Sequence, residues 1–341
     1  MNIDPKELSC ARYRVVFEAL EPLDLPSYLG STLRGAFGHA FRAVACPAPR
    51  DLHCPAPAQC PYHLIFETSP PPGSEALRTH EEIPRPFVIS PSGSVQPAPG
   101  QAGRNEFQRG DEISFELVLI GRAQEFFPYF VVALREVDRM GRGRRAVEFR
   151  RIEALSADGQ WSEVYAATDN LVHGGAPSIT LEDCSAVPAP KGPVTIEFLT
   201  QTRLKHEGRF VRHPEFQILF RRLLGRLSSL SRFHCVAPLN VDFRELIDKA
   251  GSIRLTQDDT QWTQWRRYSS RQDRPMEWEG IVGRATYEGD FAPFWKYLRF
   301  GQFVHAGHGA TFGLGRYRVL PHCRDLKASA TGERRKNPTG S

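Results

Sequence analysis

Long apolar runs are missing from the sequence, and cysteines are few. No uncharged apolar stretch approaches the ~20 residues that a membrane helix needs, and the opening MNIDPKELSC lacks the basic and apolar regions of a signal peptide. The 7 cysteines among 341 residues are odd in number and mostly scattered, unlike a secreted disulfide framework. We therefore expect a soluble, cytoplasmic protein without a membrane partner, whose thiols are reduced or bind a metal.

Familiar catalytic motifs are also missing. The chain contains no Gly-x-Ser-x-Gly elbow, no His-Glu-x-x-His helix, no EF-hand loop and no P-loop. Asp258 and Asp259 form the most visible carboxylate pair. Because adjacent residues on a strand point to opposite faces, this pair does not suit a two-metal nuclease centre.

Lysine is scarce and arginine abundant. The chain has 7 lysines against 37 arginines, yet its net charge is only +5. The planar, forked guanidinium suits phosphate binding and base stacking. A genome rich in arginine codons would give the same bias, so composition alone does not decide for a nucleic-acid partner.

Apolar periodicity predicts two similar series of elements in an α+β protein. The region from Cys46 to Gly110 carries 13 of the 27 prolines, so it should be mostly loops. The first series is a strand at 11–20, a helix at 26–45, short strands near 62–67 and 86–90, a strand at 112–120, a helix at 126–140, and strands at 147–155 and 161–168.

The second series repeats the order of the first after the linker CSAVPAPKGP. Its elements are a strand at 194–203, a helix at 214–233, strands at 252–256, 261–270 and 277–288, a helix at 290–300 and a strand at 314–320. The shared order predicts two tandem ferredoxin-like (RRM-like) βαββαβ domains. They are residues 1–186, with a Cys/Pro-rich insertion, and residues 192–320, followed by a disordered tail at 321–341.

The most informative segment is glycine-rich, GQFVHAGHGATFGLGRYRV at 301–319. Its glycines can expose backbone amides to phosphate oxygens. It is not a dinucleotide fingerprint, because the third glycine would be Phe312. The alternative is a glycine-rich turn that tight packing requires. The candidate RNA contacts in this segment are Gly307, His308, Gly309, Thr311, Phe312, Gly313, Gly315 and Arg316.

A second stretch, QWTQWRRYSSRQDRPMEWEG at 261–280, alternates aromatic residues with arginines. Aromatic rings stack on unpaired bases while arginines hold phosphates, which makes Arg267 and Arg271 candidate RNA contacts. The alternative is that the aromatic residues belong to the core and the arginines to a solvated edge.

The first predicted helix carries a candidate catalytic histidine. At about 100° per residue, Tyr28, Gly35, His39 and Arg42 share one flank between the apolar stripe and solvent, and Gly35 leaves the imidazole of His39 uncrowded. Tyr28 lies roughly 16 Å away along the axis. A lone histidine at such a boundary is more often a half-buried surface residue.

Three cysteines lie close together in the proline-rich region. Cys46, Cys54 and Cys60 are accompanied by His53 and His63, and three or four of these residues could ligate a structural zinc ion. Because the spacing contains no Cys-x-x-Cys pair, ordinary reduced thiols are the alternative.

A set of short motifs, in order along residues 11–320, resembles the CRISPR-associated endoribonucleases of the RAMP superfamily, which process precursor CRISPR RNA and consist of two ferredoxin-like domains. Singly the motifs are weak, but the ordered set is specific. The motifs are Tyr28-Leu29-Gly30 with Arg34-Gly35-Ala36-Phe37-Gly38-His39, Cys60-Pro61-Tyr62, Pro84-Arg85-Pro86-Phe87, Leu119-Ile120-Gly121, Pro128-Tyr129-Phe130, Thr202-Arg203-Leu204-Lys205, Arg267-Tyr268-Ser269 with Arg271-Gln272, and Gly309-Ala310-Thr311-Phe312-Gly313-Leu314-Gly315.

The resemblance implies cleavage within CRISPR repeats without a metal ion or other required cofactor. In such relatives the 2′-hydroxyl attacks the adjacent phosphate, leaving crRNA and a 2′,3′-cyclic phosphate. His39 matches the location of their general acid or base, Tyr28 is a distant counterpart of their tyrosine, and Arg42 stands where a lysine would be welcome. The alternative that the resemblance leaves open is a non-catalytic crRNA-binding subunit of a CRISPR effector complex.

Overall fold

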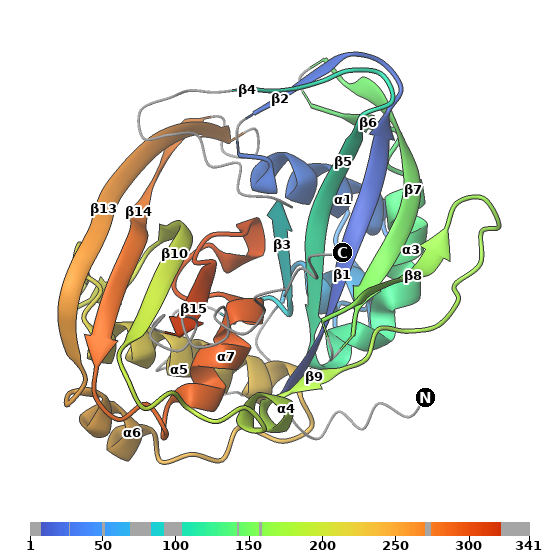
Figure 1. Cartoon of the computed structure of the whole chain (residues 1–341). Coiled ribbons are helices and arrows are strands. Elements are labelled where there is room, and N and C mark those ends of the chain that lie inside the picture. The colour runs from blue at the N-terminus through green and yellow to red at the C-terminus, as the bar shows by residue number, and fades with distance from the viewer. Residues whose placement is uncertain are drawn as a thin grey trace, which may run out of the picture.

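The computed structural model describes residues 8–26, 28–49, 52–68, 83–91, 104–141, 143–156, 159–269 and 274–321. It contains antiparallel sheets covered by helices, which confirms the expected α+β class. Figure 1 shows the first sheet (blue to green) facing the long orange hairpin of the second, with β10 and β15 between them. Within the described ranges, no helix has the length and apolar character needed to cross a membrane.

The first sheet has its first strand near the middle. Its strand order is β3-β5-β1-β7, and every neighbouring pair is antiparallel. Small additions extend it at β6, β8 and β9, and β2 pairs separately with β4. The strands are β1 (Ser9–Ala19), β2 (Leu23–Pro26), β3 (Phe87–Pro91), β4 (Arg104–Phe107), β5 (Glu112–Ile120), β6 (Arg139–Met140), β7 (Arg145–Leu155), β8 (Trp161–Ala166) and β9 (Ile179–Thr180).

Two helices, α1 (Gly30–Ala45) and α3 (Phe127–Arg135), pack together beside this sheet. Helix α1 buries residues spaced three or four apart, as an amphipathic helix requires. Its rings Phe37 and Phe41 lie 5.2 and 4.8 Å from the ring of Phe130 on α3. A 3-10 turn, η2 (Gly121–Phe126), leads from β5 into α3.

The strand expected near residues 62–67 is wrong, because Pro61–Ile65 form a short helix, α2. Proline is compatible with the first turn of a helix, where its missing N–H has no intrahelical partner. Tyr62 and Phe66, four residues apart, stack at 5.6 Å between ring centroids. Phe66 is buried against Phe37 and Phe87. The spacing of four residues between Tyr62 and Phe66 is the spacing of a helix, which is why the predicted strand is wrong.

The second sheet repeats the first. Its order is β13-β14-β10-β15 and all neighbouring pairs are antiparallel. In both sheets the main strands, numbered along the chain, lie side by side in the order second, third, first, fourth. The second strand is therefore at one edge of each sheet. The elements are α4 (Leu181–Ser185), β10 (Val194–Thr202), β11 (Lys205–His206), β12 (Arg209–Phe210), α5 (Phe216–His234), α6 (Phe243–Ala250), β13 (Arg254–Ser269), β14 (Arg274–Glu288), α7 (Trp295–Val304), η3 (Ala310–Phe312) and β15 (Tyr317–Pro321).

Three expectations for the second half need correction. The strands expected at 252–256 and 261–270 are one strand, β13, which pairs with β14 along its length. Helix α6 was not expected, although Asp242 caps it by accepting a hydrogen bond from the Glu245 N–H at 2.8 Å. Helix α7 begins at Trp295, later than the expected 290, because Asp290 first holds a turn through the Ala292 N–H.

The tail expected at 321–341 lies outside the described residues, apart from Pro321, which is the last residue of β15.

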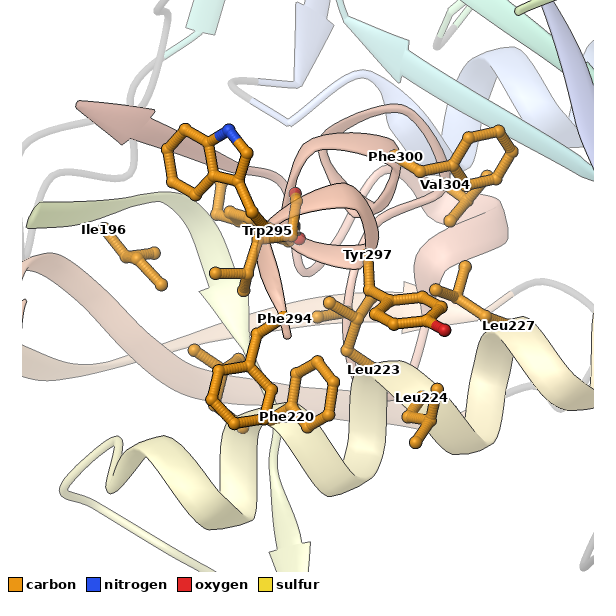
Figure 2. Packing of buried hydrophobic residues seen from close by; sticks show 14 of the residues in the cluster. Ile196, Phe220, Leu223, Leu224, Leu227, Phe294, Trp295, Tyr297, Phe300 and Val304 are labelled. Carbon is orange, nitrogen blue, oxygen red and sulfur yellow. Dashed lines mark hydrogen bonds between the residues drawn. The ribbon is translucent and has the colours of Figure 1, made fainter. Parts of the chain in front are cut away.

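The core of the second half lies between α5 and α7, as Figure 2 shows. The rings of Phe220 and Phe294 meet edge to face at 4.8 Å, and both side chains are buried. Val88, Val118 and Ile120 of the first sheet belong to the same apolar cluster. The two halves therefore share buried surface.

An ion-pair network also joins the two halves. Arg316, directly before β15, lies 3.3 Å from Glu116 on β5, and Glu116 lies 2.8 Å from Arg12 on β1. The Arg316 guanidinium also donates to the Pro91 carbonyl at 3.3 Å. The Glu116 side chain is only 11% exposed, so this contact is largely removed from solvent.

Phe220→Ala should lower the free energy of unfolding by about 3 to 5 kcal/mol, because it opens a cavity in this core. Phe243→Ala is the matched control: Phe243 is 38% exposed, so its loss should change stability by roughly 0.5 kcal/mol. Denaturant titration of both variants checks this. Equal effects would contradict the assignment of Phe220 to the core.

Candidate functional site

The glycine-rich segment after α7 is a compact loop held by its own backbone. Gly307, Gly309, Gly313 and Gly315 have φ between 72° and 86°, the left-handed region that side chains disfavour. A Cβ on Gly315 would overlap the Ala306 carbonyl oxygen. The Gly315 N–H donates to the Gln201 carbonyl at 3.1 Å. Several of these glycines are thus required by packing, as the alternative interpretation held.

The tip of this loop contacts the start of helix α1. The Tyr28 hydroxyl donates to the Phe312 carbonyl, and a Cβ on Gly30 would overlap the same oxygen. The Phe312 ring lies 4.4 Å from the Arg34 guanidinium carbon and 5.1 Å from the Trp278 ring. We call this contact the loop–helix junction. It fixes α1 against the second half of the chain.

His39 lies about two turns of helix beyond this junction. It is exposed on the face of α1 opposite the buried Phe37 and Phe41, so the expected boundary position is wrong. Outside the backbone of α1 itself, no described atom lies within 4 Å of the position that a Cβ on Gly35 would occupy. The imidazole of His39 is therefore open to a large ligand, as the glycine one turn earlier predicted.

Small residues flank His39 on both sides. Gly35 lies one turn before it and Ala43 one turn after it, and all three residues are exposed. Residues four apart are neighbours on a helix surface. The sequence analysis considered only Gly35. Ala43 could have been found in the same way, because it also lies four residues from His39.

The other two catalytic candidates contact other parts of the chain. Tyr28 precedes α1, which begins at Gly30 and not at the expected 26. Its side chain is 8% exposed, and its hydroxyl serves the loop–helix junction. Arg42 is half-buried, with its guanidinium carbon 5.4 Å from the Tyr62 ring.

The predicted RNA contacts have different surroundings. Arg316 is committed to the ion-pair network, and Thr311 is buried. His308 is exposed, while Gly307, Gly309 and Phe312 are half-buried; Gly313 and Gly315 are buried. Arg267 lies in β13, but its side chain is outside the described part of the structure, and Arg271 lies outside the described residues altogether.

A further cluster beside the glycine loop was missed. The guanidinium carbon of Arg203 lies 4.4 Å from the Phe210 ring, and that ring meets His308 edge to face at 5.8 Å. Burial lowers the pKa of Arg203, an effect that Glu279 opposes, and its Nε finds no hydrogen-bond acceptor among the described residues. We call these three residues, Arg203, Phe210 and His308, the stacking cluster. The sequence did not indicate Phe210 as a contact residue, because β11 and β12 are only two residues long and such short strands leave no recognisable pattern.

His305 is unsuited to proton transfer. It is 3% exposed, and its Nδ1 lies 3.0 Å from the Leu314 carbonyl. Burial, together with the nearby charge of Arg316, holds its pKa well below the usual range. The imidazole is therefore neutral, and its place is structural.

Comparison with known families identifies the second half of the chain. Residues 196–317, which include the stacking cluster and the glycine loop, match the family model of the CRISPR-associated endoribonuclease Cas6. Residues 196–317 therefore form a Cas6-family domain. This match favours an enzyme that processes precursor CRISPR RNA over the non-catalytic subunit. Residues 8–176 match a separate family model described as an N-terminal domain, AF_1859_N.

Solved Cas6 structures share the fold at low sequence identity. A Cas6 product complex is 17% identical over 91% of this chain and 100% of its own, with a TM-score of 0.54. A Thermus thermophilus Cas6 is 15% identical over 92% and 99%, with a TM-score of 0.53. A partial Cas6-RT-Cas1–Cas2 complex is 12% identical over 95% and 48%, with a TM-score of 0.55. No curated protein matches the sequence significantly.

Outside the Cas6-family domain, the first half of the chain has a cluster that could hold a metal ion. The ligand atoms of Cys46, Cys54, Cys60 and His63 all lie within 4.8 Å of one another. The three cysteines that the sequence singled out are thus brought together, and His63 joins them. His53 is not a member of the cluster.

Tyr28→Phe tests whether Tyr28 serves structure or chemistry. The variant leaves the Phe312 carbonyl without its hydroxyl donor, so it should lower stability by about 1 to 3 kcal/mol. RNA cleavage at a temperature where the variant is folded should stay within a few-fold of the parent. Unchanged melting with a cleavage loss of about 10² or more would instead make Tyr28 a catalytic group.

Proposed function

We propose that this chain cuts CRISPR precursor RNA inside its repeats by attack of a 2′-hydroxyl on the adjacent phosphate. The products are crRNA and an end with a 2′,3′-cyclic phosphate. The observation that carries this proposal is the loop–helix junction. It holds the helix bearing the exposed His39 against the glycine loop, which lies inside the region that matches Cas6. One continuous RNA can contact both elements.

His39 is the residue to which we assign proton transfer. Histidine exchanges protons near neutral pH, and the exposed position on α1, between Gly35 and Ala43, leaves it open to a ribose or a leaving oxygen. Cleavage by a 2′-hydroxyl needs a base for that hydroxyl or an acid for the 5′-oxygen, and an imidazole can supply either. We assign no metal ion or other cofactor to this step.

Arg42 would stabilise the charge of the pentacovalent phosphorane. It follows His39 by three residues on α1, a spacing that makes two side chains neighbours on a helix surface. Guanidinium groups hold phosphate oxygens by paired hydrogen bonds but do not release protons near neutral pH. We therefore give Arg42 an electrostatic role, with its guanidinium positioned by the Tyr62 ring.

The stacking cluster extends the RNA-binding surface that we propose. The half-buried Phe210 ring lies between Arg203 and the exposed His308, and a base could stack there while the guanidinium meets a phosphate. Nearby, the guanidinium carbon of Arg212 lies 5.5 Å from the centre of the Trp262 ring, which belongs to β13. The hairpin of β13 and β14 curves away from this cluster in Figure 1. By sequence, Arg267 and Arg271 remain further candidate RNA contacts.

We further propose that each half is a ferredoxin-like unit, with domains at 1–186 and 192–320. Both sheets have the same strand order, and in each a helix follows the first and the third main strand. Between the halves, the chain passes from α4 to β10. The two units would present their sheets to one RNA.

His39→Ala should lower single-turnover cleavage of the cognate repeat RNA by about 10² to 10⁴ while binding stays nearly intact, since general acid or base action contributes about that much. The assay contains EDTA, and the product ends are mapped. His173→Ala is the control, because His173 is also exposed but lies far along the chain, paired with Asp169.

Two results would count against the assignment of His39. Undiminished cleavage by His39→Ala would remove the residue from the chemistry. Loss of binding together with cleavage would make it an RNA contact. Product ends without a cyclic phosphate would instead reject the 2′-hydroxyl mechanism.

Phe210→Ala should weaken repeat RNA binding by roughly 1 to 3 kcal/mol, the usual contribution of one stacked base. Tyr129→Ala on α3 is the matched control, since its ring is 42% exposed on the other half of the chain. Affinity is measured across a salt series, where about five neutralised phosphates give a log–log slope near −3.5. Equal affinity in a folded Phe210→Ala would exclude stacking on this ring.

A further inference from the structure

The cluster of three cysteines and one histidine lies where the first helix ends. Cys46 directly follows α1, and its N–H donates to the Arg42 carbonyl. Cys60 is the N-cap of α2, and His63 lies within that helix. Cys54 comes from the loop between the two helices. Three separate turns of chain thus converge on one point.

The sulfur of Cys60 is already held between the two helices. Its thiol donates to the carbonyl of Ala45, the last residue of α1, at 3.6 Å. Cys60 is only 4% exposed and Cys46 only 8% exposed. The two sulfurs therefore lie in a protected place beside the end of α1 before any ion binds.

The spacing matches a tetrahedral site. Zinc binds sulfur at about 2.3 Å and histidine nitrogen at about 2.0 Å, so its ligand atoms lie roughly 3.8 Å apart. The observed limit of 4.8 Å requires each atom to move by less than about 1 Å. The Nδ1 of His63 lies 3.6 Å from the Glu67 carboxylate, the kind of partner that orients a ligating imidazole.

We propose that Cys46, Cys54, Cys60 and His63 bind one Zn²⁺ ion that clamps the end of helix α1 to helix α2. Three thiols and one imidazole fill a tetrahedral sphere, so no position is open for substrate. On binding, the thiols release their protons to solvent. The ion is structural and takes no part in the chemical step of RNA cleavage.

The clamp acts on the helix that carries the proposed catalytic residues. Tyr62, between the ligands Cys60 and His63, lies 5.4 Å from the guanidinium carbon of Arg42. Arg42 lies in the last turn of α1, and Cys46 directly follows that helix. Loss of the ion should therefore loosen residues 30–66, while the core between α5 and α7 stays intact.

The test is metal analysis of the whole purified chain, followed by replacement of zinc with Co²⁺. We expect one zinc per chain and the thiolate-to-cobalt absorption of a tetrahedral site. Cys54→Ser and His63→Ala should lose the metal and lower the melting temperature. Cys235→Ser and His53→Ala are the controls; neither residue belongs to the cluster, and both should keep one equivalent.

Hydrogen exchange separates a clamp from incidental binding. After chelation, amides in α1 and α2 should exchange at least about tenfold faster, while those in α5 should not change. Equal exchange rates with and without metal would reject the clamp, even if the cluster binds an ion. A chain that takes up no zinc or cobalt, or in which two of the three thiols are joined in a disulfide, would overturn the proposal.

These readouts do not depend on the proposed nuclease activity. His39→Ala should keep its full zinc content, because His39 lies on the exposed face of α1 away from the four ligands. A chain that holds zinc but leaves repeat RNA uncut would contradict the proposed function and leave the metal site standing.

Discussion

The contact between the Phe312 carbonyl and the start of helix α1 is the constraint on which the rest of this molecule depends. The hydroxyl of Tyr28 donates to that oxygen, and only a glycine at position 30 lets the helix approach it so closely. The left-handed glycines shape the loop that presents this oxygen. Since α1 also carries His39, the same contact sets where the exposed imidazole lies relative to the second half of the chain.

Helix α1 is held at both ends by different chemistry. At its start the junction uses a hydrogen bond and an arginine over a ring. At its end the cysteines and His63 gather around one point. Between them, Phe37 and Phe41 anchor the buried face, so the opposite face, with His39, is held in a fixed place. A rigid element suits a group whose proton transfer depends on position.

The sequence predicted the repeated order of strands and helices, because alternation and helical spacing are local signals. It also indicated Cys46, Cys54 and Cys60 as candidate ligands of one metal ion, with ordinary reduced thiols as the alternative, and the structure brings the three together. It did not predict the ion pair of Arg316 with Glu116 between the two sheets, since these residues lie 200 positions apart along the chain. The sequence did not predict the contact of Arg203 with Phe210 either. The segment with Tyr62 and Phe66 was predicted as a strand, because a helix of five residues shows little periodicity. Contacts between distant segments were the part that local patterns could not supply.

A structure of the chain bound to repeat RNA with a 2′-deoxy nucleotide at the scissile position tests the central claim most directly. The junction and the exposed face of α1 predict that the scissile phosphate or its flanking ribose lies about 2.6 to 3.2 Å from the imidazole of His39. The same RNA should pass the glycine loop and the ring of Phe210. A scissile phosphate bound elsewhere, with His39 still facing solvent, would contradict the account.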